Sequence, residues 1–157
     1  EEQEEKLKYI LDVEVSDEKI DKIIELLNEY KPKKGEKVKL CSIKKINDLW
    51  KKSDSYISKA YANIEQKSKY LQSRVNLLEE NVLEPPRINY DEENELINFT
   101  NGRNRFSNLR DLGCKKMPFI LNDEITIEKM EELENIKIEK EKKNKSKRKV
   151  VIVDEEA

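Results

Sequence analysis

The chain of 157 residues has no histidine, only three glycines and only two cysteines. Without histidine it lacks the side chain that most often acts as a general base near neutral pH and most often binds zinc. Its glycines do not form a Gly-x-Gly-x-x-Gly or a Gly-Lys-Ser/Thr motif, the usual signatures of a loop that binds phosphate. We therefore expect a protein that is not an enzyme and that has no cofactor and no metal site.

Cys41 and Cys114 stand far apart, and neither belongs to a Cys-x-x-Cys pair. Isolated thiols are typical of a reducing compartment, where we expect no disulfide between them. There is no run of about twenty apolar residues, so the sequence predicts no membrane-spanning helix. The chain also begins without a methionine or a signal peptide, and we expect it to be a fragment of a longer protein.

Charged residues make up 42% of the sequence and apolar residues 36%, with a net charge of -2. Helices with narrow apolar stripes suit such proportions better than a thick core does. The balanced total charge by itself favours neither nucleic acid nor a membrane as a partner. The composition thus predicts a mainly α-helical, elongated coiled-coil protein.

The first region, residues 1–35, is expected to combine an extended segment with an amphipathic helix. Residues 7–15 alternate apolar and polar side chains at the period of a strand, although their first half also contains good helix formers. Ser16 is a suitable N-cap for a helix over residues 17–30, whose apolar side chains recur at spacings of three and four. Pro32 ends this helix.

The second region, residues 36–84, predicts one long coiled-coil helix. From Ser42 to Leu83 neither glycine nor proline interrupts the chain, and apolar or small residues recur at steps of three and four, as in a heptad seam. Such a narrow seam must be covered, either by a partner chain, which we favour, or by the shorter helices of the same chain. The residues expected to bind the partner are Ile43, Ile46, Trp50, Ile57, Ile64, Leu71, Val75, Leu78 and Val82.

The third region, residues 85–122, predicts irregular structure that docks onto neighbouring helices. A short helix over residues 91–99 is favoured there, and the alternative is a hairpin with Asn101-Gly102 as its turn. The apolar stretch 117–121 is expected to be a loop that plugs into those helices. Arginines flanking apolar side chains are typical of protein interfaces, and the docking residues are expected to be Arg103, Arg105, Phe106, Leu109 and Phe119.

The last two regions are a helix over residues 123–142 and a basic tail over residues 143–157. The stretch KKNKSKRK at residues 142–149 resembles a monopartite nuclear localisation signal, and the alternative is a generic basic tail. The residues that carry this resemblance are Lys145, Lys147, Arg148 and Lys149.

The tail ends in four apolar residues followed by three acids. This pattern resembles a SUMO-interacting motif, in which an extended segment adds a strand to the edge of the SUMO sheet and the acids meet its basic rim. A rival interpretation is strand pairing inside an assembly. The residues concerned are Val150, Val151, Ile152, Val153, Asp154 and Glu155, with Glu156 after them.

Together these patterns predict a non-enzymatic scaffold subunit of a nuclear multiprotein complex, for example one associated with chromosomes. Its partners would be other helical subunits in a hetero-oligomer and, through the tail, SUMO. One alternative is a helical nucleic-acid-binding protein, because lysines crowd the first turns of the long predicted helix. Another is a cytosolic tethering coiled coil.

Overall fold

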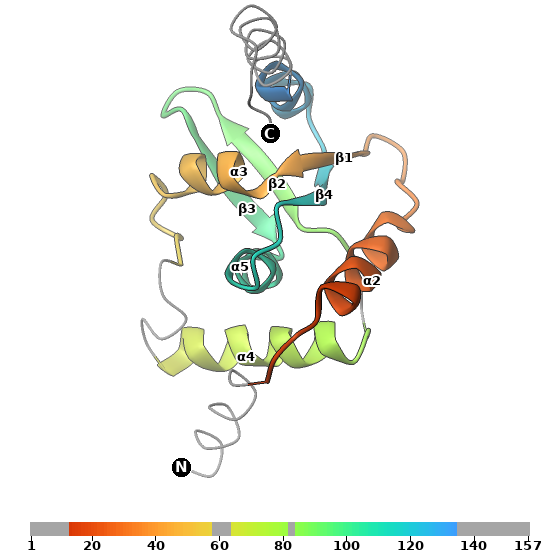
Figure 1. The fold of residues 1–157 in the computed structure, drawn as a ribbon. Coiled ribbons are helices and arrows are strands. Elements are labelled where there is room, and N and C mark those ends of the chain that lie inside the picture. Colours follow the sequence, from red (N-terminus) through yellow and green to blue (C-terminus); the bar gives the residue numbers. More distant parts are fainter. Residues whose placement is uncertain (1–12, 58–63, 82–83, 135–157) are drawn as a thin grey trace, which may run out of the picture.

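The computed structural model describes residues 13–57, 64–81 and 84–134, and it shows a mixed α/β fold (Figure 1). In chain order the elements are α2 (Asp17–Asn28), β1 (Lys37–Ser42), α3 (Ile43–Trp50), α4 (Ile64–Leu78), β2 (Arg87–Asp91), β3 (Leu96–Asn101), α5 (Arg103–Asp111) and β4 (Lys116–Leu121), and a further helix covers residues 124–134.

The four strands form one mixed sheet in the order β1-β4-β2-β3. β1 is antiparallel to β4, with Lys37 opposite Leu121, whereas β2 and β3 form an antiparallel hairpin and β2 runs parallel to β4. β4 is therefore an inner strand, and five of its six residues are buried. A short continuous apolar run is what a strand covered on both faces requires.

The centre of the core is the side chain of Trp50, the last residue of α3, which is fully buried. Its ring meets those of Tyr56, Phe99 and Phe106 edge to face, at centroid distances of 4.9, 4.7 and 5.7 Å. Phe106 also contacts Phe119 of β4, at 5.8 Å. This aromatic cluster joins α3, β3, α5 and β4, and aromatic pairs in such geometry contribute stability beyond the area they bury.

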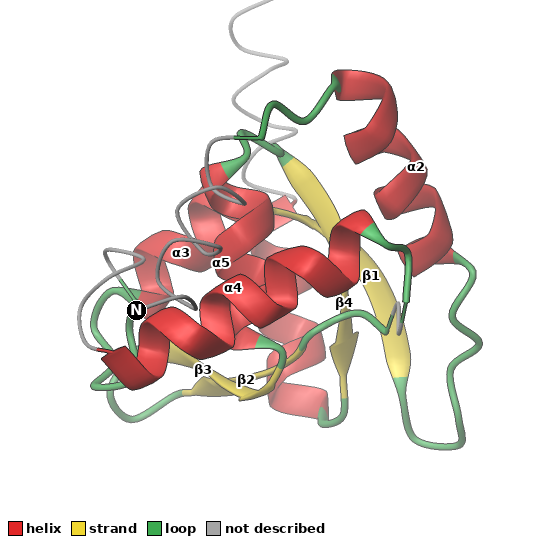
Figure 2. Cartoon of the chain, turned by 90° about the horizontal axis from the view of Figure 1, so that it is seen from below, coloured by secondary structure: helices red, strands yellow, loops and turns green. Residues whose placement is uncertain are grey.

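α4 packs against α5 and α2 rather than directly on the sheet. Figure 1 shows α5 between the sheet and α4, and Figure 2 shows α4 lying across the near side of the molecule from below. α5 consequently has neighbours on both sides. Phe106, Ser107, Asn108 and Leu109 of α5 are all fully buried.

The predicted coiled coil is wrong, because the region taken for one long helix is divided into a strand and two helices. Residues 37–42 pair with β4, and α3 ends at Trp50. After it, the Ser53 hydroxyl accepts from the Ser55 amide and donates to Asn98, at 3.2 and 2.6 Å. Short polar side chains that form hydrogen bonds with nearby backbone groups compete with helix formation, and here these bonds favour the end of the helix.

The irregular docking region is also corrected, since residues 87–121 supply three strands and α5. The favoured helix over residues 91–99 is wrong, and so is the turn of the alternative hairpin. The true turn lies between β2 and β3, where the Asp91 side chain accepts from the Asn94 amide at 3.1 Å. The stretch 117–121 is the inner strand β4, not a plug.

Two predicted helices are present. α2 begins after Ser16, whose hydroxyl accepts from the Lys19 amide at 3.1 Å, and it buries Ile20, Ile23 and Leu27. The last helix covers residues 124–134 and buries Met130. The predicted nuclear localisation signal and the SUMO-like motif lie outside the described residues.

A polar cluster fastens the segment between α2 and β1 to the sheet. Glu36 accepts from the Lys33 amide at 2.9 Å, from the Tyr30 hydroxyl at 2.7 Å and from the guanidinium of Arg87 on β2. These hydrogen bonds, that of the Lys33 amide foremost, lower the pKa of Glu36 from 4.5 to about 2. The cluster therefore requires the ionised carboxylate.

The first prediction concerns acid stability. Because the folded-state pKa of Glu36 is lowered, its contribution to the free energy of unfolding is full above pH 4.5 and is lost as the pH falls toward 2. We expect Glu36→Gln to melt at a lower temperature than the wild type at pH 7, and the difference to shrink as the pH falls to 3, as followed by circular dichroism. Glu25→Gln, at an exposed position, is the control. Parallel melting curves over the whole pH range would contradict this account.

Candidate anion-binding site

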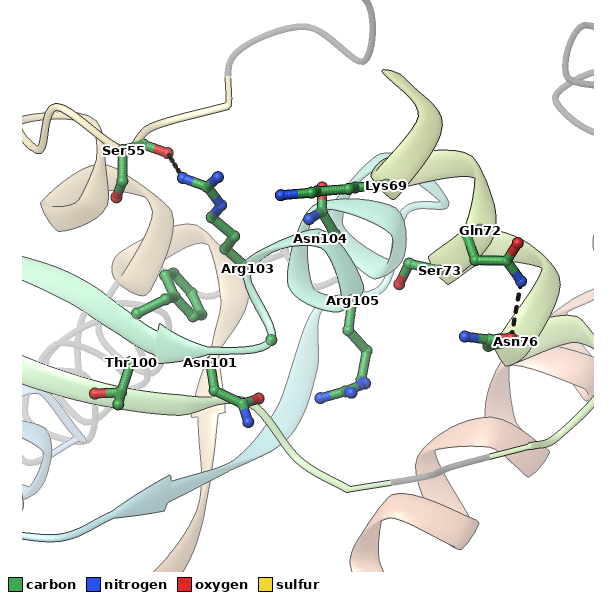
Figure 3. Close-up of a pocket in the computed structure, with 12 residues that line it drawn as sticks. Ser55, Lys69, Gln72, Ser73, Asn76, Thr100, Asn101, Arg103, Asn104 and Arg105 are labelled. Carbon is green, nitrogen blue, oxygen red and sulfur yellow. Dashed lines mark hydrogen bonds between the residues drawn. The ribbon is translucent and has the colours of Figure 1, made fainter. Parts of the chain in front are cut away.

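A cavity of about 510 Å³ opens at the N-terminus of α5 (Figure 3). Its walls come from the segment after α3, from α4, from the end of β3 and from the first turn of α5. The residues that line it are Ser55, Lys69, Gln72, Ser73, Asn76, Phe99, Thr100, Asn101, Gly102, Arg103, Asn104 and Arg105. Three are cationic, most of the others carry an amide or a hydroxyl, and none of these lining residues is a carboxylate.

The three cations reach the cavity from two helices. In Figure 3, Lys69 extends from α4 toward Asn104, Arg103 points toward Ser55, and Arg105 projects to the opposite side, toward Asn101. One nitrogen of Arg103 lies 3.5 Å from the carbonyl oxygen of Ser55. Within the described residues no ion pair joins Arg103 or Arg105 to a carboxylate. The three positive charges thus lie on different sides of the cavity around the start of α5.

Arg105 is the most deeply buried of these cations. Its Nη1 is buried and has no hydrogen-bond partner among the described residues. Desolvation by burial lowers the pKa of Arg105, and Glu84 acts in the opposite direction. A buried donor without a partner is costly, typically by about 1–3 kcal/mol, so an acceptor that entered the cavity would relieve that cost.

Gly102 is the N-cap of α5, and its backbone has φ +86, in the left-handed region. A β-carbon on it would lie 2.8 Å from Pro86 Cα and 2.9 Å from Arg105 Nη1, closer than atoms pack. The residue therefore provides both the backbone conformation and the space for this close approach. In the described part of the chain no side chain caps the helix, so the first amides of α5 remain available to a ligand.

A buried polar network fixes α4 relative to α5. The Arg74 side chain of α4 donates from Nε to Asn108 Oδ1 at 2.6 Å and from Nη2 to the Tyr70 hydroxyl at 2.9 Å. The Tyr70 hydroxyl donates in turn to Asp111 at 2.8 Å, so it links the Asp111 carboxylate to the buried guanidinium of Arg74. Asn108 also donates to the carbonyl oxygens of Tyr70 and Asn104. This network sets the side-by-side position of the two helices that carry the cations.

The structure places the residues of the predicted partner-binding seam inside the chain. Ile43, Ile46, Trp50 and Ile57 belong to the core, Leu71 is buried on α4, and Val75 and Leu78 are half-buried there. The side chain of Ile64 and residue Val82 lie outside the described part of the chain. The seam thus packs largely within this chain.

The predicted docking residues divide into two groups. Phe106, Leu109 and Phe119 are fully buried in the core, whereas Arg103 and Arg105 line the cavity. The sequence contained a signal that separates the two arginines from the three buried apolar residues. Arginines in the first turn of a helix oppose the helix dipole unless an anion lies beside them. The lining residues on α4 carried no such signal in the sequence, because they come close to α5 only in the folded structure.

Two other cavities are present in the described structure. One, at the opposite end of α5, is described below, and the other is lined mainly by glutamates of the β2–β3 turn and the last helix.

The described residues contain no group of histidine, cysteine and acidic side chains that could hold a metal ion. No helix among them is long and apolar enough to cross a membrane. Both cysteines are free thiols.

Comparisons of this chain with protein-family models, with curated proteins and with solved structures give no match. The case for a function therefore depends on the geometry and chemistry of the cavity itself.

The second prediction tests the requirement for glycine at the N-cap of α5. Gly102→Ala combines a strained φ with an atomic overlap, and we expect it to lower the free energy of unfolding by more than 2 kcal/mol, roughly the sum of both costs. Gly113→Ala is the matched control, because its φ is +89 but nothing lies within 4 Å of the added atom. It should cost only the backbone strain, about 1 kcal/mol. Equal losses in urea denaturation would show that the contacts with Pro86 and Arg105 do not matter.

The third prediction concerns the network between α4 and α5. Tyr70→Phe removes the hydroxyl that links Arg74 to Asp111, and it leaves a buried guanidinium short of a partner. We expect a loss of about 1–3 kcal/mol in the free energy of unfolding. Tyr56→Phe is the control, since among the described residues the Tyr56 hydroxyl accepts only from the neutral amide of Asn47, and we expect its loss to be about 1 kcal/mol or less. A smaller effect at Tyr70 than at Tyr56 would contradict the role of the network.

Proposed function

We propose that the cavity at the N-terminus of α5 binds the phosphate groups of a small organic phosphate, with a nucleotide as the preferred class. The observation that carries this proposal is that Lys69, Arg103 and Arg105 line a cavity at the uncapped N-terminus of α5, and that the lining residues include no carboxylate. A helix N-terminus attracts anions through its unpaired amides and its dipole, and arginine donates to phosphate in a bidentate manner.

The helix dipole gives an electrostatic reason for this proposal. Neither the first turn of α5 nor its N-cap carries an acidic side chain, and two arginines stand where cations are unfavourable. A bound phosphate would reverse the sign of this interaction, because it supplies the negative charge that the helix terminus and both guanidinium groups require. An anion at this terminus would therefore stabilise the arrangement.

The rest of the cavity suits the uncharged part of such a ligand. Gln72, Ser73 and Asn76 of α4 and Thr100 and Asn101 of β3 supply donors and acceptors without charge. Groups of this kind form hydrogen bonds with a sugar or a base. A volume of about 510 Å³ also falls within the range of small-molecule sites.

Binding, rather than catalysis, is the proposed activity. The lining residues contain no carboxylate, thiol or imidazole that could serve as a general base. A place for the chain in a nuclear multiprotein complex stays a prediction, and so does binding of SUMO by the tail. The coiled-coil packing through which the complex was expected to assemble is absent from the described structure, so that prediction loses its main support.

A second candidate is the phosphate backbone of a nucleic acid, which has the same recognition chemistry. The location of the cations around one cavity favours a single phosphorylated molecule, because a nucleic-acid backbone is followed by charges spread along a track. The dependence of affinity on salt separates the two: contact with several backbone phosphates gives a steep decline, whereas a ligand held in one cavity gives a shallower one.

The fourth prediction tests the proposed ligand class by calorimetry with the full chain. We expect at least one of ATP, GTP, CTP and UTP to bind, and the matching nucleoside to bind at least tenfold more weakly. Arg103→Gln and Arg105→Gln should each weaken binding by about 10- to 100-fold, the value of a hydrogen bond to a charged group. Lys51→Gln is the control, because Lys51 is exposed and lies outside the lining.

Two results would overturn the proposal. One is the absence of binding by all four nucleotides and by pyrophosphate at millimolar concentration. The other is binding that both arginine substitutions leave unchanged while the variants keep the circular dichroism spectrum of the wild type.

A further inference from the structure

A second cavity, of about 750 Å³, lies at the opposite end of α5. It is formed where the start of α3, the end of α5 and the segment leading into β4 come together. The residues that line it are Ser42, Ile43, Lys44, Asn47, Arg110, Gly113, Cys114, Lys115 and Lys116. Ile43 and the aliphatic parts of the lysines make it more apolar than the first cavity. Four of its lining residues are cationic and none of them is acidic.

Arg110 is the most enclosed of these cations, with 13% of its side chain exposed. Its Nε donates to Asp111 at 2.9 Å and its Nη1 to Asn47 at 3.1 Å. The remaining nitrogen, Nη2, is buried and has no partner among the described residues. Lys44 is exposed and paired with Asp48, whereas Lys115 and Lys116 are exposed at the rim. The cavity thus combines apolar walls, a buried unpartnered donor and a basic rim.

A suitable occupant has branched apolar side chains followed directly by carboxylates. The chain itself contains such a segment, in which Val150, Val151, Ile152 and Val153 are followed by Asp154, Glu155 and Glu156. Its charge is opposite to that of the rim. Its apolar side chains suit walls of isoleucine and lysine stems.

The geometry of the chain permits this segment to reach the cavity. The last helix is joined to α3 by a hydrogen bond of 2.9 Å, from Lys45 Nζ to the carbonyl oxygen of Leu133. Lys45 is adjacent to Lys44 of the cavity lining. The segment between the last described residue and Val150, residues 135–149, can span up to about 50 Å when extended. A connection of this kind also gives the tail an effective concentration of the order of millimolar at the cavity.

We propose that the second cavity is an intrachain docking site for residues 150–156. The apolar residues would enter between Ile43 and the lysine stems, and the acidic residues would meet Arg110, Lys115 and Lys116. The proposal is independent of ligand binding at the first cavity. It gives the tail a binding surface within this chain, where the tail would compete with any external partner for the same residues.

Cys114 supplies the test, because its thiol lines the cavity and is half-buried. Alkylation of the full chain by the neutral reagent N-ethylmaleimide is followed by mass spectrometry of the Cys114 peptide. Cys41 is buried, and burial raises its pKa to about 12, so it reacts slowly. We expect the double substitution Val151→Asp and Val153→Asp to speed alkylation of Cys114 at least fivefold. Val13→Asp, at an exposed valine elsewhere, should leave the rate unchanged.

Reversing the charges at the rim of the cavity, and then on the tail, provides a second test. Lys115→Glu with Lys116→Glu should also speed alkylation of Cys114, although the added negative charges by themselves would slow it by disfavouring the thiolate. Adding Asp154→Lys and Glu155→Lys to that variant should restore protection. Equal rates in the wild type and the valine variant, or no restoration by the second charge reversal, would overturn the proposal. So would protection that rises with protein concentration, because it would assign the occupant to another copy of the chain.

Discussion

The packing of α5 between the sheet and α4 is the contact on which the rest of this structure depends. On one side, Phe106 and Leu109 enter the aromatic core around Trp50. On the other, Asn108 holds Arg74 of α4. Because α5 has only nine residues, both of its ends stay close to these fixed points. Its N-terminus carries the arginines of the first cavity and its C-terminus carries Arg110 of the second. The positions of the arginines in both cavities thus follow from one packing interaction.

The contact between α4 and α5 is polar where an apolar contact would serve stability equally well. Replacing both partners of a buried hydrogen bond by apolar groups of the same shape is often nearly neutral or stabilising, so stability alone does not explain Arg74. The hydrogen bonds from Arg74 and Asn108 instead have fixed directions, and they admit one rotation and one register of α4. That register carries Lys69, Gln72, Ser73 and Asn76 to the first cavity. We interpret the network as a device that specifies the geometry of the site.

The sequence predicted the features that depend on neighbouring residues. Ser16 is the predicted N-cap of α2, and its hydroxyl accepts the capping hydrogen bond from the Lys19 amide. The error lay in connecting Ile43, Trp50, Ile57 and Leu71 into one seam. Their spacing of three and four is equally produced by a helix, a turn and a second helix that face the same core. The turn at residues 51–57 contains serines and an aspartate but no glycine or proline, so the usual signs of a helix end were absent.

β4 was missed for a related reason, because a short apolar run is not distinguished by periodicity from a buried loop.

The scarcity of glycine excludes one kind of phosphate site and leaves another open. A loop that surrounds phosphate with several backbone amides needs several glycines, and this chain cannot build one. A helix N-terminus needs only one residue that permits the close approach, and Gly102 meets that need beside Arg105. The remaining charge comes from side chains far apart in the sequence. Because Lys69 lies on α4 and the arginines on α5, no local motif contains the site, and only the contact between the two helices assembles it.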